Sequence, residues 1–158
     1  GWYLEKMSKK IKPFRHSITA RYSEVDQQGV VFNSHYLAYI DDTMDTWIRQ
    51  FSDLRQRFNW DMMNKKCSIE WYGSIKSGEI LDIYVIVTHW GDTSWNLGYI
   101  GVCEGRQIFT AEIVYVSVKL DSNEKIETPI GIREALGEAV DIENFINSFL
   151  KTDDSNKL

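Results

Sequence analysis

The sequence lacks any excess of basic residues, and it contains little cysteine. Its 158 residues include 18 Lys and Arg against 23 Asp and Glu, which gives a net charge of −5. Because phosphate binding needs a basic face, this balance argues against a nucleic-acid partner. The two cysteines, Cys67 and Cys103, lie in apolar, strand-like runs. We expect them to be buried free thiols in a reducing compartment, and a disulfide between interior strands is the less favoured alternative.

Long hydrophobic runs and clusters of metal ligands are also missing. The longest apolar runs have the length of a strand, so the sequence predicts no membrane span. The first ten residues lack the apolar core of a secretory signal, and we therefore expect a cytoplasmic protein. The histidines, His16, His35 and His89, are too dispersed to indicate a metal site, so we expect no bound metal. A Ser-His-Asp set is not apparent either.

What the sequence does contain is typical of one folded domain. Its hydrophobic fraction is 43% and its aromatic fraction 13%, and its length fits a single domain. We place this domain at residues 13–151. Residues 1–12 are interpreted as an N-terminal arm that includes a processing remnant, and residues 152–158 as a polar, disordered tail.

Alternating and β-branched segments predict five strands. They are expected at residues 16–22, 67–72, 80–90, 94–103 and 107–120. Tight turns, Gly91-Asp92-Thr93 and Glu104-Gly105-Arg106, join the last three strands into an antiparallel meander, because Gly and Asp tolerate the positive φ of such turns. On the strand at 80–90, one face carries Leu81, Ile83, Val85 and Val87.

A long amphipathic helix is expected between the first and second strands. Its apolar stripe recurs at three and four residues and comprises Tyr36, Leu37, Ile40, Met44, Trp47, Ile48 and Phe51. The helix starts near Asn33 or Ser34, and either side chain is a candidate N-cap. Residues 54–66 are interpreted as a helical fragment and a loop. Thr128-Pro129 and Asp141 each mark the start of a further helix, with Thr128 as the cap of the first.

The order of these elements predicts the fold class. One antiparallel sheet has a face to bury, and only one internal helix is long and apolar enough to cover it. That helix is apolar over much of its circumference, which favours a curled sheet. We therefore expect an α+β protein with a curved antiparallel sheet wrapped around a long central helix, followed by C-terminal helices.

The segment between the first strand and this helix resembles a known family signature. Residues 22–36, YSEVDQQGVVFNSHY, are similar to the motif of hotdog-fold acyl-CoA thioesterases, in the branch typified by 4-hydroxybenzoyl-CoA thioesterase and the bacterial proteins associated with the Tol-Pal system. Residues 68–72 resemble the strand that follows the family's helix. The similarity extends over residues 17–120. Many Tol-Pal-associated members have histidine where Asn33 stands, and small residues where Gln27 and Gln28 stand.

The resemblance implies a thioester hydrolase. In such enzymes the aspartate at the position of Asp26 is the essential acid, as nucleophile or as general base, and the backbone amide at the position of Asn33 points at the thioester carbonyl. We assign substrate contact to Gly29, Val31, Phe32, Tyr36 and Ser94. The implied substrate is an acyl-CoA or acyl-carrier-protein thioester, with no cofactor beyond the CoA of the substrate. The implied assembly is a homodimer, often paired into a homotetramer.

Other interpretations of the same residues remain open. Asp-x-x-Gly is a common turn composition, so Asp26 could be a plain turn residue, and Asn33 a plain helix cap. Tyr36 could belong to the core, and Ser94 could simply end a turn. As a whole, the chain could be a non-catalytic acyl-CoA-binding hotdog protein or, less favoured, a hotdog dehydratase. The sequence leaves the acyl group open among aromatic, short-chain and long-chain classes.

Overall fold

The computed structural model describes residues 12–51 and 53–156, and their side chains up to residue 149. The strands and helices follow the predicted α+β order. They are β1 (Phe14–Thr19), the 3-10 helix η1 (Tyr22–Glu24), α2 (Asn33–Arg49), α3 (Leu54–Phe58), β2 (Trp60–Trp71), β3 (Ile80–Trp90), β4 (Ser94–Cys103), β5 (Arg106–Lys119), α4 (Ile130–Leu136) and α5 (Ile142–Asn156).

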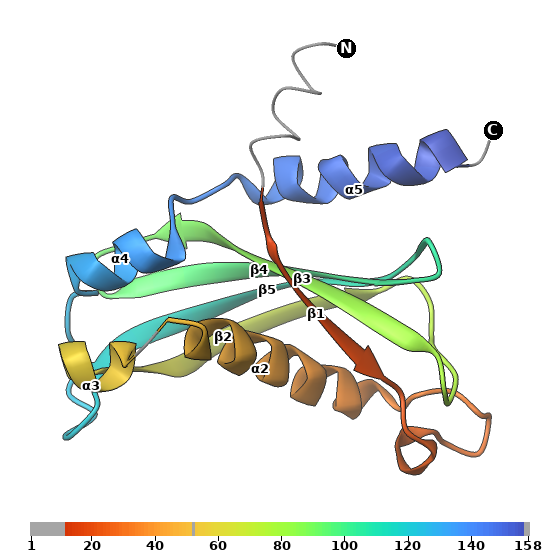
Figure 1. The fold of residues 1–158 in the computed structure, drawn as a ribbon, viewed down its shortest axis with the longest axis horizontal. Coiled ribbons are helices and arrows are strands. Elements are labelled where there is room, and N and C mark those ends of the chain that lie inside the picture. Colours follow the sequence, from red (N-terminus) through yellow and green to blue (C-terminus); the bar gives the residue numbers. More distant parts are fainter. Residues whose placement is uncertain (1–11, 52, 157–158) are drawn as a thin grey trace.

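The strands form one antiparallel sheet in the order β1-β3-β4-β5-β2. The predicted meander is confirmed, and the bounds predicted for β3 and β4 are those observed. The strands β1 and β2 form the two edges of the sheet. Figure 1 shows the long strands curving over α2 on one face, while α5 lies on the opposite face.

The main core lies between α2 and the concave face of the sheet. The face predicted for β3 is confirmed, because all four of its residues are fully buried. From the helix, Tyr36, Ile40, Trp47 and Ile48 pack against them. Leu37, which belongs to the predicted stripe, is 42% exposed. Burial of one large apolar side chain stabilises a fold by roughly 1.5–3 kcal/mol. The buried face of α2 therefore contributes most of the free energy that holds the helix on the sheet.

A second, smaller cluster lies on the convex face of the sheet. It consists of Ile86, Ile100 and Phe145, with Phe145 contributed by α5. The helix approaches the sheet closely at Gly98, where an added Cβ would lie 2.8 Å from the side chain of Ile142. The glycine therefore allows α5 to cover the convex face.

The prediction for residues 54–66 is wrong in its second half. The strand β2 begins at Trp60 and not at residue 67, and it pairs with β5 along its whole length. The run from Asn64 to Lys66 is polar and exposed, so the sequence shows no alternation there. A register shift between these two residues marks a bulge. Backbone pairing at an edge, and not side-chain burial, makes this segment a strand.

The predicted N-cap of the central helix is also wrong. The helix α2 begins at Asn33, so Phe32 occupies the N-cap position, and no side chain caps the helix. Neither Ser34 nor Asn33 makes the predicted capping bond. The start of the helix is fixed instead by the chain segment that precedes it, described below.

Three smaller expectations are corrected. Pro129 is the N-cap of α4, and the hydroxyl of Thr128 is hydrogen-bonded to that of Ser117 at 2.7 Å, so Thr128 does not cap that helix. Both cysteines are free as predicted, but Cys67 is exposed on β2 and not buried.

The helix α5 continues to Asn156, so it includes five residues of the predicted disordered tail. The predicted helix start at Asp141 is confirmed, because its carboxylate accepts from the Asn144 amide at 3.1 Å.

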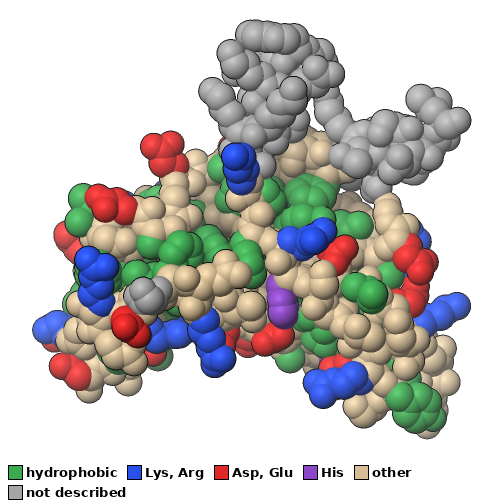
Figure 2. Space-filling model, in the orientation of Figure 1, with side chains coloured by type: hydrophobic (Ala, Val, Ile, Leu, Met, Phe, Trp, Pro, Cys, Tyr) green, Lys and Arg blue, Asp and Glu red, His purple; other side chains and the backbone are tan. Residues whose placement is uncertain are grey.

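The charges are distributed without a dominant basic area on the visible face. Figure 2 shows Lys and Arg side chains interspersed with Asp and Glu side chains. This mixture is consistent with the small net charge of −5. Within the part of the chain that the structure describes, no helix is long and apolar enough to cross a membrane.

The exposed edge at β2 leads to a prediction about assembly. This strand spans 12 residues, and its outer backbone groups face no other strand of the sheet. Proteins rarely leave so long an edge unprotected, so we expect two copies to pair through it as a homodimer at least. Light scattering at micromolar concentration should give twice the mass of the chain. A monomeric mass would contradict this expectation.

Candidate functional site

The predicted motif folds into a short hairpin between η1 and α2. The amide of Asp26 donates to the carbonyl of Val30 at 2.8 Å, and that of Phe32 donates to the carbonyl of Glu24 at 3.2 Å. Gly29 closes the turn at a φ of +78°, which only glycine adopts without strain. The hairpin, residues 24–32, therefore ends directly at the first residue of the helix.

The side chain of Asp26 is part of this turn. Its Oδ1 atom accepts from the amide of Gln28 at 2.8 Å and from that of Val30 at 3.4 Å. Its other oxygen, Oδ2, has no hydrogen-bond partner among the residues described, and the residue is exposed. The two interpretations of Asp26 are therefore compatible, because one oxygen holds the turn and the other faces solvent.

The amide of Asn33 lies at the positive end of a 17-residue helix. As the first helical residue, it has no acceptor within the helix, and no other acceptor is found in the described part of the chain. Such an amide, supported by the helix dipole, can bind an anion or polarise a carbonyl. Because one hairpin connects them, a carboxylate and a free amide donor lie on the same short segment.

The hairpin is docked on the loop that precedes β3. The amide of Val31 donates to the carbonyl of Ile75 at 2.8 Å, and the amide of Ile75 donates to the Tyr36 hydroxyl at 3.3 Å. Val31 is 2% and Tyr36 0% exposed. Burial is the main cause that raises the pKa of Tyr36. Val31 and Tyr36, both predicted to contact the substrate, are thus buried between the hairpin and the sheet. Phe32, also predicted to contact the substrate, is 57% exposed at the start of the helix.

Glu79 holds that supporting loop in place. Its carboxylate accepts from the amide of Lys76 at 2.7 Å and from the guanidinium of Arg106 at 3.2 Å. Arg106 also donates to the carbonyl of Ser74 at 3.4 Å. The bond from the Lys76 amide is the main cause that lowers the pKa of Glu79. The carboxylate is therefore ionised at neutral pH, and the loop is tied to the start of β5.

Ser94 is not close to the hairpin within one chain. It begins β4, whereas Cys103 at the other end of that strand contacts Glu79 under the supporting loop. At about 3.3 Å per residue, the strand separates its two ends by about 30 Å. The substrate contact assigned to Ser94 stays a prediction, and it needs a second copy of the chain.

The contact between Glu24 and Tyr39 was not predicted from the sequence. Tyr39 is 5% exposed on α2, and its hydroxyl lies beside the Glu24 carboxylate as a polar contact that falls short of hydrogen-bond geometry. A signal was present, because Tyr36 and Tyr39 lie three residues apart on the same helix face, and buried tyrosine hydroxyls usually find a partner. The sequence did not indicate which residue would lie opposite these hydroxyl groups.

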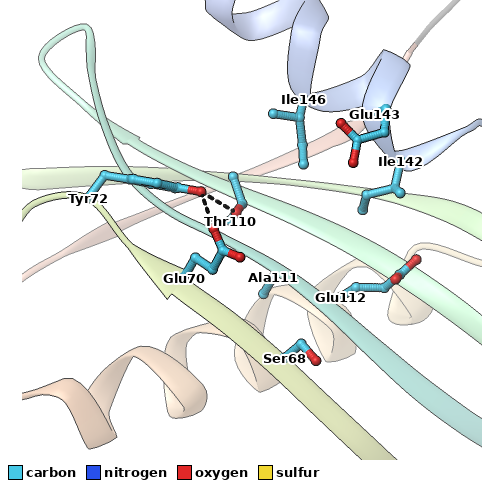
Figure 3. A pocket seen from close by; sticks show the side chains of 9 residues that line it. All are labelled: Ser68, Glu70, Tyr72, Thr110, Ala111, Glu112, Ile142, Glu143 and Ile146. Atoms are coloured by element: carbon cyan, nitrogen blue, oxygen red, sulfur yellow. Dashed lines mark hydrogen bonds between the residues drawn. The ribbon is translucent and has the colours of Figure 1, made fainter.

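A separate cavity of about 290 Å³ lies on the convex face of the sheet (Figure 3). In it, the hydroxyl of Tyr72 donates to Glu70 at 2.7 Å. Glu112 and Glu143 line the same cavity. Three carboxylates disfavour an anionic ligand there, and the cavity lies across the sheet from α2. It is therefore not part of the candidate site. Among the described residues, no group of three or more metal-ligating side chains converges.

Comparison with known proteins identifies the family of the fold. The model of the thioesterase-like superfamily matches residues 20–136, which include the hairpin, α2 and the entire meander. The chain belongs to the thioesterase-like superfamily. No curated protein matches it significantly.

Several solved structures share the fold. A predicted thioesterase from Bacillus stearothermophilus is 22% identical, with a TM-score of 0.70 over 79% of this chain and 94% of that one. A 1,4-dihydroxy-2-naphthoyl-CoA thioesterase from Synechocystis is 14% identical, with a TM-score of 0.68 over 79% and 96%. A Staphylococcus aureus protein in complex with CoA is 11% identical, with a TM-score of 0.67 over 87% and 84%. At these identities the likeness establishes the hotdog fold.

The positive φ of Gly29 leads to a prediction about the hairpin. An alanine there meets no atom within 4 Å, so the substitution Gly29→Ala adds backbone strain alone, about 1–2 kcal/mol. We expect a matching loss in free energy of unfolding, with faster hydrogen exchange at the amides of Val30 and Phe32. The matched control is Gly137→Ala, because Gly137 also has a positive φ and open space around it. Equal exchange at those amides in both variants would contradict the prediction.

Proposed function

We propose that this member of the superfamily is an acyl-CoA thioesterase of the 4-hydroxybenzoyl-CoA thioesterase-like, Tol-Pal-associated branch. It hydrolyses a thioester to a free acid and CoA. One observation supports the proposal above all others. A single hairpin holds a carboxylate with one free oxygen, Asp26, directly before a helix whose first amide, that of Asn33, has no acceptor in the described part of the chain.

The proposed chemistry needs only these two groups. The thioester carbonyl oxygen accepts a hydrogen bond from the Asn33 amide, which stabilises the negative charge that develops on this oxygen. In the general-base route, Oδ2 of Asp26 takes a proton from water as the water oxygen bonds to the carbonyl carbon. The carbon–sulfur bond then breaks, and the protonated carboxyl returns the proton to the departing CoA thiolate.

The nucleophilic route uses the same atoms in a different order. The Asp26 carboxylate bonds to the carbonyl carbon, the carbon–sulfur bond breaks, and the thiolate takes a proton from water. A second water hydrolyses the resulting mixed anhydride to the free acid and the Asp26 carboxyl group, and the hydroxide left by the first water takes the proton that restores the carboxylate. Both routes use the oxygen that the turn leaves free. Trapping of labelled oxygen from water in Asp26 after one turnover would separate them.

The substrate is proposed at the level of its class. Thioesters of CoA are favoured over those of an acyl carrier protein, since a structural neighbour was solved with CoA and another is a naphthoyl-CoA thioesterase. A non-catalytic binding protein is the competing hypothesis. Saturable release of free thiol from aromatic, short-chain and long-chain acyl-CoA would exclude it and would identify the acyl group.

The helix start offers a sharp test of the oxyanion donor. Because Asn33 is the first helical residue, proline fits there, and Phe32 already has the extended backbone that a residue before proline needs. Asn33→Pro therefore deletes the donor and leaves the helix intact. We expect turnover to fall about 10²–10³-fold, the usual effect of losing one such donor.

Asn33→Ala is the matched control, because it keeps the backbone amide and removes only the side chain. It is expected to retain most of the wild-type turnover, measured as thiol release. Thermal unfolding of both variants checks that the fold is intact. Equal losses of turnover in two folded variants would assign the role to the side chain instead.

Asp26→Asn tests the carboxylate itself. The amide oxygen of asparagine can still accept from Gln28 and Val30, so the hairpin should persist while the basic oxygen is lost. Loss of general-base assistance should lower kcat by about two to four orders of magnitude, and loss of a nucleophile by more. Binding of acyl-CoA, measured by calorimetry on the same preparation, should stay near the wild-type value. Wild-type turnover in this variant would remove Asp26 from the mechanism.

A further inference from the structure

Glu24 is the residue that joins the hairpin to the elements on both sides of it. Its side chain is only 12% exposed, and one carboxylate oxygen accepts from the amide of Arg21 at 2.8 Å. Its carbonyl accepts from the amide of Phe32, the residue before Asn33. Glu24 also lies two residues before Asp26. A shift of Glu24 therefore moves both groups of the proposed site.

The second contact of the Glu24 side chain is made across space by the central helix. The buried hydroxyl of Tyr39 has no partner of hydrogen-bond geometry in the described structure, and it faces the Glu24 carboxylate. Burial is the main cause that raises the pKa of Tyr39, and the negative charge of Glu24 adds to it. Burial also acts to raise the pKa of Glu24, but the Arg21 amide, the Tyr39 hydroxyl and the positive charges of Arg21 and His35 outweigh it and lower that pKa. Glu24 is thus an ionised carboxylate, and the Tyr39 hydroxyl beside it does not complete a hydrogen bond to it.

The neighbouring tyrosine shows what such a contact does when it is complete. Tyr36 lies three residues before Tyr39, with the two rings edge to face at 5.9 Å, and its hydroxyl accepts from the Ile75 amide. In that way α2 fixes the loop under one strand of the hairpin. Tyr39 lies beside Glu24, the first residue of the hairpin, without a complete hydrogen bond. Tyr36 therefore supports the hairpin through Ile75, and Tyr39 approaches its first residue.

We infer that Glu24 and Tyr39 act as a pair of positioning residues. The polar contact between the tyrosine hydroxyl and the carboxylate holds the hairpin against α2, and this contact fixes the orientation of the free Asp26 oxygen relative to the Asn33 amide. The inference rests on the proposed thioesterase function. Neither residue touches the reacting atoms, so their loss should disturb the geometry of attack and not the binding of the CoA portion. Misplacement of a reacting group by about 1 Å can cost up to a hundredfold in rate.

The test combines two conservative variants, Tyr39→Phe and Glu24→Gln, with their double variant. Each single change is expected to lower kcat about tenfold with KM changed by less than about twofold. The double variant should be no slower than the slower single one, because both changes remove the same contact. Additive losses would overturn the pairing, and wild-type kcat in either single variant would overturn the positioning role.

The matched control is the other glutamate–tyrosine pair, Glu70 and Tyr72, which lies in the cavity on the convex face. Tyr72→Phe and Glu70→Gln remove similar atoms and should leave kcat unchanged. Equal losses in both pairs would indicate a general effect on the fold and would overturn the inference. Thermal unfolding of all variants is measured alongside.

The pH dependence of activity tests whether the charge of Glu24 is needed, or only its packing. Because the pKa of Glu24 lies below the ordinary value of 4.5, its charge is present above that pH and is lost as the pH falls below it. The acid limb of wild-type activity should then include the protonation of Glu24. In Glu24→Gln this protonation cannot occur, so the acid limb should change. An identical acid limb in the two proteins would contradict the role of the Glu24 charge.

One readout does not depend on activity. Hydrogen exchange at the amides of Gln28, Val30 and Phe32 should be about tenfold faster in Tyr39→Phe and Glu24→Gln than in the Glu70 and Tyr72 variants. If the wild type releases no thiol from any acyl-CoA, the proposed function fails, and the exchange rates still decide whether the pair holds the hairpin. If thiol release is normal and exchange is unchanged, the positioning pair alone fails.

Discussion

The packing of α2 into the concave face of the sheet is the constraint on which the other features depend. Its buried face fixes the rotation of the helix about its own axis, and this rotation determines where the first turn points. With Ile40 and Ile48 in the core, Tyr36 reaches the loop at Ile75 and Tyr39 lies beside Glu24 of the hairpin. The helix is not capped by a side chain, so its start is defined by the strand-like segment that precedes it. The packing of α2 in the core therefore also determines the geometry of the candidate site.

Much of this arrangement could be predicted from the sequence, because the information is local. The strand β3 is long and rich in β-branched residues, and turn residues mark its ends, so its bounds were predicted correctly. The motif around Asp26 is likewise contiguous, and its glycine is required by a backbone angle. Where each residue's environment is set by near neighbours in the chain, pattern analysis succeeds.

The errors arise where distant pairing determines the structure. The first half of β2 has a polar composition, and only its ladder with β5 makes it a strand. Thr128 was expected to cap a helix, but its hydroxyl is hydrogen-bonded to that of Ser117 on β5. The position of Glu24 opposite Tyr39 depends on how a turn folds back over a helix. None of these partners is adjacent in sequence, so no periodicity encodes them.

The small cluster on the convex face has a practical consequence for how this domain is delimited. The match to the family ends at residue 136, but Phe145 of α5 covers Ile86 and Ile100 beyond that limit. A chain shortened to the family boundary would keep every residue of the hairpin and would expose an apolar area on the back of the sheet. Such surfaces promote aggregation. The stretch that contains the candidate site is therefore shorter than the stretch that keeps the convex face of the sheet covered.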